Sequence, residues 1–354
     1  MNKKRYIKKD NKVKVALLGA TGLVGQVFVH MLLHHERFEL SLITGSDSRT
    51  GKRYGNEVNW GLPFPMPEAA KDLTLESADL PILKERLTLR GIRIVFSALP
   101  TNIAQQVEPA LRDLGCFVFS NAAALRYDED VPILIPEVNP ESLALIEKQG
   151  YPRTGFVITN ANCSTTGLVV ALAPLKQFAI KEVFVSTYQS ISGAGYPGVP
   201  ALDILGDTIP FIQQEEEKMV LEFSKIMQLD APLFPHCVRV PVPFGHLETV
   251  WLTCDLPVET TDIIATWQNF RYENLPGPSF SHVPVLYLEQ ESFPRPSMSF
   301  WGTPPGIQVF TGRVRKVNGK IGFTLLVNNV VKGAAGGSIQ NAELFLNKYS
   351  VNLH

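Results

Sequence analysis

The sequence lacks the features that mark several classes of protein. Only four of its 354 residues are cysteine, and no two of them form a Cys-x-x-Cys pair, so neither a zinc ribbon nor a disulfide scaffold is expected and a reducing compartment, the cytoplasm, fits best. A net charge of −1 gives no general attraction for nucleic acid or an anionic membrane. No apolar run approaches the roughly 18 residues that span a bilayer, and internal repeats and low-complexity segments are absent. These absences predict neither nucleic acid nor a membrane as a partner.

What is present indicates a folded soluble protein. Hydrophobic residues make up 45% of the chain and charged residues 19%, and its length is too great for one ordinary core, so we expect two domains. Residues 1–14 are rich in lysine and arginine but contain no apolar segment of signal-peptide length. We interpret them as a frayed solubilising tail in preference to a nucleic-acid-binding arm.

A glycine-rich turn lies near the start of the chain. The apolar segment 13–18 reads as a strand, Gly19-Ala20-Thr21-Gly22-Leu23-Val24-Gly25 follows at once, and a helical pattern comes next. Glycines between a strand and a helix let a pyrophosphate approach the backbone at the helix N-terminus, although such turns also occur for packing reasons alone. The spacing is a variant of the usual dinucleotide fingerprint, and its place in a strand–helix unit favours dinucleotide binding.

The end of the next predicted strand, residues 38–43, bears on the choice of cofactor. Hydroxyl groups, among them Ser46, and the cation Arg49 follow it, with Asp47 as the only acid among them. An acidic residue here would favour NAD, whereas arginine and hydroxyls favour the 2′-phosphate of NADP. Strands alternate with helices through the N-terminal half of the chain, which predicts an α/β fold with a Rossmann-type, doubly wound parallel sheet.

Two histidines on the first helix, His30 and His34, are spaced i, i+4 and could in principle bind a metal. No third ligand is evident near them in the sequence. A polar helix face explains them better, so no metal site is predicted.

Cys163 is the first candidate for chemistry. It follows the apolar segment 155–158 and lies in a polar Asn-Cys-Ser-Thr-Thr cluster, and it precedes a helical pattern. A cysteine at the first turn of a helix is favoured as a thiolate, and the free backbone N–H groups there can hold an oxyanion. The alternative is a half-buried structural cysteine, but a core cysteine is rarely surrounded by capping residues.

Further candidates follow Cys163 along the chain. Gln189 lies on a predicted strand, Glu215 and Lys218 share one face at the start of a helix, Arg239 lies on another strand, and His246 follows a tight turn. Glu215 and Lys218 could bind a zwitterion together or form only a solvated helix start. Arg239 and His246 could be a carboxylate clamp and a base, the alternative for His246 being a solvated turn residue.

Arg126 lies in a loop after the predicted strand 116–120. The loops after parallel strands form the ligand-binding edge of such a sheet. From the sequence alone, a surface charge is an equally good interpretation.

Taken in order, these motifs resemble the aspartate-semialdehyde dehydrogenase family, in its archaeal and fungal branch, over nearly the whole chain. The matching segments are Gly19–Gly25, Phe96–Pro100, Ile135–Asn139, Asn162–Thr165, Ser192–Gly195, Arg239–Val242, Gly245-His246 and Lys332–Gly336. The resemblance implies reduction of β-aspartyl phosphate by NADPH to aspartate semialdehyde, with release of phosphate. It places the enzyme in the biosynthesis of lysine, threonine, methionine and isoleucine.

The resemblance also implies roles for single residues. Cys163 is the nucleophile that forms a thioacyl enzyme, His246 the general acid/base, and Gln189 the residue that orients the intermediate. The substrate-binding residues are Arg239 for the α-carboxylate, Glu215 for the amino group, and Lys218, Arg126 and Asn121 at the phosphate site. The cofactor-binding residues are Gly19, Thr21, Gly22, Leu23, Val24, Gly25, Ser46, Arg49, Ser97, Ser192, Gly193 and Asn329.

The family's domain organisation carries over as an expectation. Residues 1–160 and 333–354 form the NADP-binding Rossmann domain, to which the C-terminal helix returns, and residues 161–332 form an α+β catalytic and dimerisation domain with a mixed sheet. The expected assembly is a homodimer or a homotetramer. Two departures from the family pattern are Ala161, where proline is common, and the order of Ser48 and Arg49.

Three other functions remain open. N-acetyl-glutamyl-phosphate reductase shares the fold, but it typically has glycine and tyrosine around its cysteine, where this chain has Asn162 and Ser164. A malonyl-CoA-type reductase is excluded by no motif, because fold does not determine substrate. A catalytically silent NADP-binding protein is opposed by the presence of both Cys163 and His246.

Overall fold

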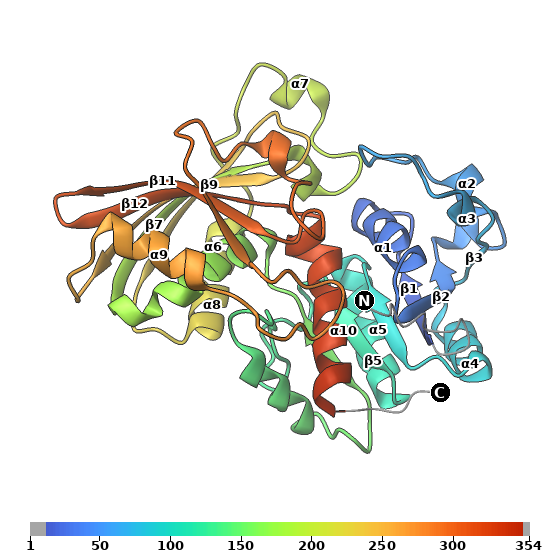
Figure 1. Cartoon of the computed structure of the whole chain (residues 1–354). Helices are drawn as coiled ribbons and strands as arrows, with labels where there is room; N and C mark the ends of the chain where they lie inside the picture. The colour runs from blue at the N-terminus through green and yellow to red at the C-terminus, as the bar shows by residue number, and fades with distance from the viewer. Residues whose placement is uncertain (1–11, 350–354) are drawn as a thin grey trace, which may run out of the picture.

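The computed structural model of the protein describes residues 12–349, which contain a pair of six-stranded sheets lying side by side (Figure 1). The predicted solubilising tail falls outside the described residues, except for its last three positions. No helix between residues 12 and 349 has the length and apolar character needed to cross a membrane.

The first sheet is parallel throughout. Its strands are β1 (Val13–Leu18), β2 (Phe38–Thr44), β3 (Leu75–Glu76), β4 (Ile94–Ser97), β5 (Phe117–Ser120) and β6 (Phe156–Thr159). They lie in the order β3-β2-β1-β4-β5-β6, which is the order of a dinucleotide-binding sheet. The predicted Rossmann-type fold is therefore confirmed.

Helices cover both faces of this sheet. They are α1 (Leu23–Leu33), α2 (Tyr54–Glu57), α3 (Glu68–Lys71), α4 (Leu80–Arg90), α5 (Thr101–Asp113) and α10 (Gly336–Tyr349). Alternate strand residues divide between two cores, because successive side chains point to opposite faces. Leu17 and Phe119 pack with the side of α1 and α10, whereas Leu18 and Val118 pack with the side of α4 and α5. The last helix thus packs on the first sheet.

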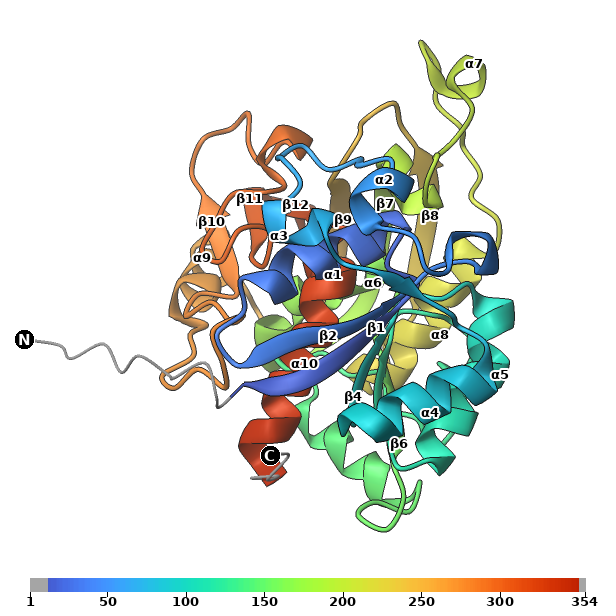
Figure 2. The same ribbon diagram turned by 90° about the vertical axis from the view of Figure 1, so that its right-hand side faces the viewer.

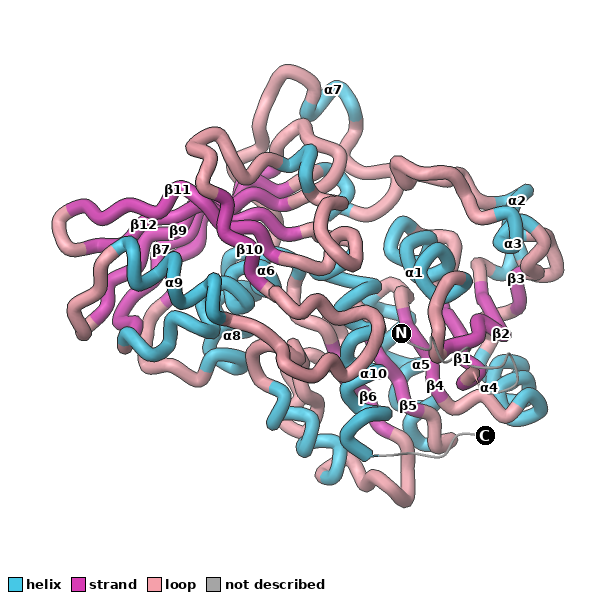
Figure 3. The backbone as a smooth tube through the Cα atoms, in the orientation of Figure 1, coloured by secondary structure: helices cyan, strands magenta, loops and turns pink. Residues whose placement is uncertain are grey.

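The second sheet is mixed, as predicted. Its strands are β7 (Ile180–Gln189), β8 (Leu233–Arg239), β9 (His246–Cys254), β10 (Val285–Leu288), β11 (Val309–Val317) and β12 (Lys320–Val327), in the order β10-β11-β12-β9-β7-β8. Helices α6 (Cys163–Leu172), α8 (Glu215–Met227) and α9 (Thr260–Asn269) pack against one face of it (Figure 3). The other face leaves Phe184, Tyr188 and Phe234 partly exposed.

The short helix α7 (Ala201–Ile204) lies at the tip of an arm, residues 195–212, that projects from the body of the molecule (Figure 2). The other short helices are 3-10 helices at Asp47–Arg49, Pro140–Glu147, Ala173–Phe178, Ile191–Ala194 and Pro296–Met298, and a π-helical turn at Val331–Ala335.

Several boundaries differ from the sequence-based expectation. Apolar residues continue to alternate up to Val242, but strand β8 ends at Arg239, because Pro241 and Pro243 have no N–H to donate to a neighbouring strand. Apolar residues also occur up to Val331, but strand β12 ends at Val327, and Oδ1 of Asn328 then accepts from the backbone N–H groups of Val330 and Val331. The side chain of Asn328 therefore turns the chain into the π-helical segment.

Candidate active site

Cys163 is the first residue of α6, as predicted. Asn162 is the N-cap residue, and its Oδ1 accepts from the backbone N–H of Ser164 (2.9 Å) and of Thr165 (3.3 Å). The expectation that several first-turn N–H groups are free for an oxyanion is therefore too generous. Only the N–H of Cys163 itself has no partner among the described residues.

His246 lies beside the cysteine. Its Nε2 is 3.1 Å from Sγ of Cys163, and the ring is fully buried at the start of β9 after the turn at Gly245, whose φ of +88° suits glycine. The backbone N–H of Ser190 donates to Nδ1 over 3.0 Å. Because Nδ1 accepts that bond, the neutral ring carries its proton on Nε2 and directs it toward the sulfur.

Burial controls the charge of this pair. It raises the pKa of the Cys163 thiol to about 12, and the Glu215 carboxylate adds to the shift while Arg239 and the Ser164 N–H oppose it. It also lowers the pKa of His246 to about 3, with a further contribution from the positive charge of Arg239. Desolvation thus outweighs the helix terminus, and the pair is neutral near pH 7, contrary to the thiolate expected from the sequence.

Arg239 and Glu215 form the charged part of the site. Arg239 is buried at the end of β8, next to Gln189 at the end of β7, and its Nη1 donates to the carbonyl of Ser190 over 2.8 Å. No carboxylate in the range 12–349 forms an ion pair with it, so a ligand carboxylate would supply the missing partner. Glu215 accepts through Oε1 from Asn162 (2.8 Å) and from Gln189 (2.9 Å). Gln189 therefore holds Glu215 in place.

A cavity of about 230 Å³ joins Cys163 to the nucleotide loop, residues 19–25, and Glu215, Arg239 and His246 lie outside its lining. The lining residues come from helices and loops of both halves of the molecule and are Val24, Asn121, Arg126, Ala161, Asn162, Cys163, Ser192, Gly193, Gly195, Asn329, Val330, Gly333 and Ala334. Arg126 is buried here, so the surface-charge interpretation is wrong. Lys218 lies one turn into α8, half-buried, outside this lining and without a side-chain hydrogen bond among the described residues.

The glycines of the nucleotide loop serve two different purposes, close packing and space for a ligand. A Cβ at Gly19 would come within 2.5 Å of the Ala98 carbonyl, and one at Gly25 within 2.2 Å of the Gly19 carbonyl, so both are required by packing. A Cβ at Gly22 would meet nothing closer than 3.8 Å. Gly22 is the N-cap of α1, and the space beside it and the first N–H groups of the helix can receive a phosphate.

Four of the other predicted cofactor residues, Ser46, Arg49, Asn329 and Ser97, lie in different surroundings. Ser46 and Arg49 are at the surface after β2, whose Thr44 accepts from the Gly19 N–H over 3.2 Å. Asn329 holds the catalytic turn, since its Oδ1 accepts from the Gly245 N–H (2.9 Å) and its Nδ2 donates to Ser192 (2.9 Å). Ser97 is fully buried, and its carbonyl accepts two hydrogen bonds from Asn121, from the backbone N–H and from Nδ2. Ser97 therefore fixes the position of Asn121, which lines the cavity.

Three residues at the site escaped the sequence interpretation as functional candidates. Gly333 has to be glycine, because its Cβ would lie 2.7 Å from Cβ of Cys163. Asn160 donates through Nδ2 both to Asn121 (2.9 Å) and to the Ala334 carbonyl (2.7 Å). Glu222 contacts both Arg126 and Asn162. The small-residue run around Gly333 was the one signal visible in the sequence.

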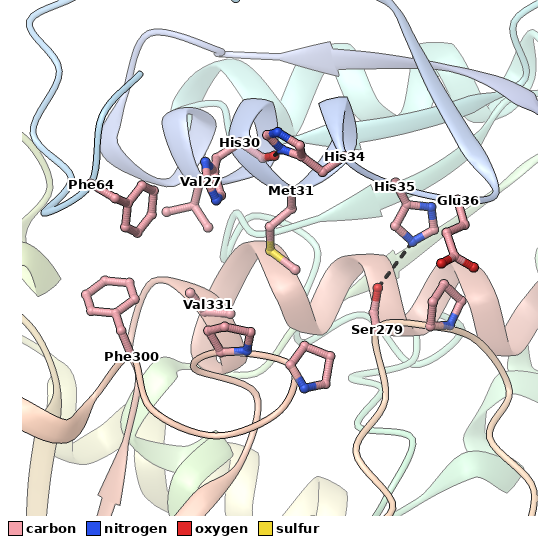
Figure 4. Close-up of a pocket in the computed structure, with 13 residues that line it drawn as sticks. Val27, His30, Met31, His34, His35, Glu36, Phe64, Ser279, Phe300 and Val331 are labelled. Carbon is pink, nitrogen blue, oxygen red and sulfur yellow. Dashed lines mark hydrogen bonds between the residues drawn. The ribbon is translucent and has the colours of Figure 1, made fainter. Parts of the chain in front are cut away.

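A second cavity of about 280 Å³ lies away from Cys163, between α1 and the loops before β10 and β11 (Figure 4). His30 and His34 line it with Phe64 and Phe300. His34 hydrogen-bonds through Nδ1 to the carbonyl of His30 over 2.8 Å. Across residues 12–349 no three His, Cys, Asp or Glu side chains gather where they could hold a metal ion.

Comparisons with known proteins agree with this geometry. A family model described as the NAD-binding domain of semialdehyde dehydrogenase matches residues 14–146, and one described as its dimerisation domain matches residues 172–332. The chain is 40% identical over 348 residues to an aspartate-semialdehyde dehydrogenase of Archaeoglobus fulgidus, covering 95% of this chain and 98% of that protein. It is 33% identical to a malonyl CoA reductase (NADP) of Metallosphaera sedula, with coverage of 95% and 98%. Among solved structures, aspartate semialdehyde dehydrogenase with NADP from Candida albicans superposes with a TM-score of 0.85 at 30% identity, covering 96% of this chain and all of that chain.

Proposed function

The chain belongs to the semialdehyde dehydrogenase family, and we propose that it is an aspartate-semialdehyde dehydrogenase, which reduces β-aspartyl phosphate with NADPH to L-aspartate 4-semialdehyde and phosphate. The observation that carries the proposal is the 3.1 Å contact between His246 and Cys163, which lines a cavity that also reaches the nucleotide loop. The product class makes it a biosynthetic enzyme for lysine, threonine, methionine and isoleucine. We place it in the cytoplasm, because all four cysteines are free thiols.

Recognition of an aspartyl group follows from the charges. Arg239 is a buried cation that lacks a carboxylate partner in the described chain, and Glu215 is a buried acid with one oxygen engaged by two amides. Together they suit the α-carboxylate and the amino group of an amino acid. Arg126 and Asn121, which line the cavity, are assigned to the phosphate together with Lys218, which lies outside the lining.

The thiol of Cys163 and the imidazole of His246 act together in the acyl transfer. Sγ of Cys163 attacks the acyl carbon, the bond from that carbon to the phosphate oxygen breaks, and the thiol proton leaves on the phosphate, so that a thioester remains on the enzyme. His246 keeps a proton on Nε2 beside Sγ, where it can donate to the oxygen that becomes negative, and the N–H of Cys163 is a second donor. Release of the aldehyde leaves the sulfur as a thiolate, which takes up a proton from solvent and becomes the thiol again.

The cofactor is NADP, and the residues present fit it. The open space at Gly22 and the uncapped start of α1 suit the pyrophosphate, and Arg49 with Ser46 suits the 2′-phosphate. When bound, NADPH supplies the hydride that reduces the thioester. The contact residues proposed for it are Gly19, Thr21, Gly22, Leu23, Val24, Gly25, Ser46, Arg49, Ser97, Ser192, Gly193 and Asn329.

We assign residues 1–160 and 333–354 to the cofactor domain and residues 161–332 to the catalytic and dimerisation domain. Two observations support this division. The two family models match either side of residue 160, at 14–146 and 172–332. Helix α10 packs on the first sheet through Ile339 and Phe345.

A malonyl-CoA reductase is the second candidate, favoured by the 33% identical relative. We expect purified protein to sustain repeated turnover of NADP and aspartate semialdehyde only when phosphate is present, and to oxidise NADPH with a β-aspartyl phosphate far faster than with malonyl-CoA. Absorbance of NADPH measures both reactions. Faster turnover of malonyl-CoA would contradict the proposal and favour the alternative.

We also propose a homodimer built on the open face of the second sheet, in preference to a tetramer. Phe184 and Phe234 stack on this face with ring centroids 4.7 Å apart, and they are 38% and 48% exposed in the single chain. Light scattering should give twice the mass of the chain, and Phe184→Lys with Phe234→Lys should shift it toward the monomer. Leu89→Lys, on the exposed side of α4, is the matched control. A double variant that stays dimeric would show that the dimer interface lies on another surface.

A further inference from the structure

Glu222 is a buried acid that the chemistry above does not use. It lies in the middle of α8 and is fully buried, and its two oxygens serve different segments of the chain. Oε1 accepts from Nη1 of Arg126 over 2.7 Å and from the Tyr127 hydroxyl over 3.4 Å. Oε2 accepts from the backbone N–H of Asn162 over 2.6 Å. One carboxylate therefore contacts both the arginine of the cavity and the residue before the nucleophile.

On the arginine side, Glu222 determines which donors of Arg126 remain available. Nη1 is taken by Glu222, Nη2 donates to the Asn121 carbonyl over 3.3 Å, and Nε is buried with no partner among the described residues. Lys225, one turn further along α8, donates to the carbonyls of Arg126, Asp128 and Val131 over 2.8 to 3.0 Å. Helix α8 thus holds both the guanidinium and the backbone of its loop.

On the nucleophile side, two acids of α8 hold the N-cap residue. Asn162 donates through its backbone N–H to Glu222 and through its side chain to Glu215 (2.8 Å). The same side chain caps the first turn of α6 through Oδ1. Since Cys163 follows Asn162 directly, a shift of Asn162 would move the sulfur.

We propose that Glu222 is a positioning residue that fixes Arg126 relative to helix α6. Arg126 can then bind the phosphate group of an acyl phosphate while Cys163 attacks the acyl carbon of the same molecule. This rests on the proposed function, because it assumes that Arg126 binds the phosphate. Glu222 is fully buried and does not line the cavity. Its effect reaches the reaction through Arg126 at one end and through Asn162 at the other.

The test is Glu222→Gln, which preserves volume but offers one acceptor oxygen in place of two. Loss of a charged, buried hydrogen bond predicts a KM for phosphate raised about 10- to 100-fold in NADP reduction with aspartate semialdehyde. The NADPH burst formed without phosphate should slow as well, because the N-cap contact is also weakened. The KM for NADP should change less than about twofold, since the nucleotide loop is not touched by Glu222.

Glu217→Gln, on the exposed side of the same helix, is the matched control and should leave all three quantities unchanged. If Glu222→Gln fails to fold, Glu222→Asp provides the same measurement, because it keeps the charge but is too short to reach both partners. A folded variant with an unchanged phosphate KM would overturn the inference. A wild type without any phosphate-dependent turnover would overturn the proposed function and the inference together, so the two failures are distinguishable.

Discussion

Replacement of Cys163 by alanine is expected to lower kcat by about four orders of magnitude or more, because it removes the atom that accepts the acyl group. The sulfur lies in the cavity beside His246, and no other described cysteine lines that cavity. The variant should retain its fold, since the substitution removes a single heavy atom, Sγ, next to a cavity. Phosphate-dependent NADP reduction with aspartate semialdehyde measures the loss, and mass spectrometry of peptides should find an acyl adduct on Cys163 in the wild type only.

The matched control is Cys254→Ala. Cys254 ends β9, is also partly buried, and lies outside the residues that line the cavity. It should retain full activity. Turnover that persists in Cys163→Ala but falls in Cys254→Ala would show that the wrong thiol has been assigned.

His246→Asn should lower kcat by about 10²- to 10⁴-fold, the usual contribution of one proton-transferring side chain. Asparagine can still receive the Ser190 N–H, so the turn at Gly245 should be preserved, but it does not carry a titratable proton to the sulfur. Burial lowers the pKa of His246 to about 3, so the ring is neutral throughout pH 5 to 8. Protonation of His246 should therefore produce no loss of kcat/KM in the wild type as pH falls from 7 to 5.

The control for this variant is His236→Asn, on an exposed position of β8. Its rate should match the wild type at every pH. A decline of wild-type kcat/KM between pH 7 and 5 that disappears in His246→Asn would contradict the neutral ring. It would indicate that His246 has a pKa close to its ordinary value in the free enzyme, because kcat/KM reports the ionisations of the free enzyme.

The sequence predicted the first sheet well because its signals are local. An apolar segment, a glycine turn and a helical pattern in succession are typical of a strand–turn–helix unit, and strand β1 matches the predicted residues 13–18. The start of α6 at Cys163 was equally predictable, because Asn162 is a favourable N-cap. Boundaries that depend on distant partners were less accurate. The residues after Arg239 alternate like a strand, but their prolines cannot pair with β7.

The charge state of the nucleophile shows why local reasoning has a limit. A helix N-terminus favours a thiolate, and that much follows from the sequence around Cys163. The depth of burial and the placement of Glu215, 52 residues further along the chain, reverse the preference and raise the pKa of the thiol. Desolvation depends on everything packed around a group, so it belongs to the tertiary structure.

The sequence by itself determined the kind of protein: a dinucleotide-binding sheet, a cysteine at a helix start, and an arginine and a histidine on later strands. These are properties of short segments, and their order along the chain was enough to suggest the family. Only the tertiary structure decided that Cys163 meets His246 at 3.1 Å, that Arg239 is a buried cation, and that Glu222 joins Arg126 to Asn162. The physical reason is that each of these contacts bridges 60 to 96 residues or depends on burial by both sheets, and sequence spacing does not encode either.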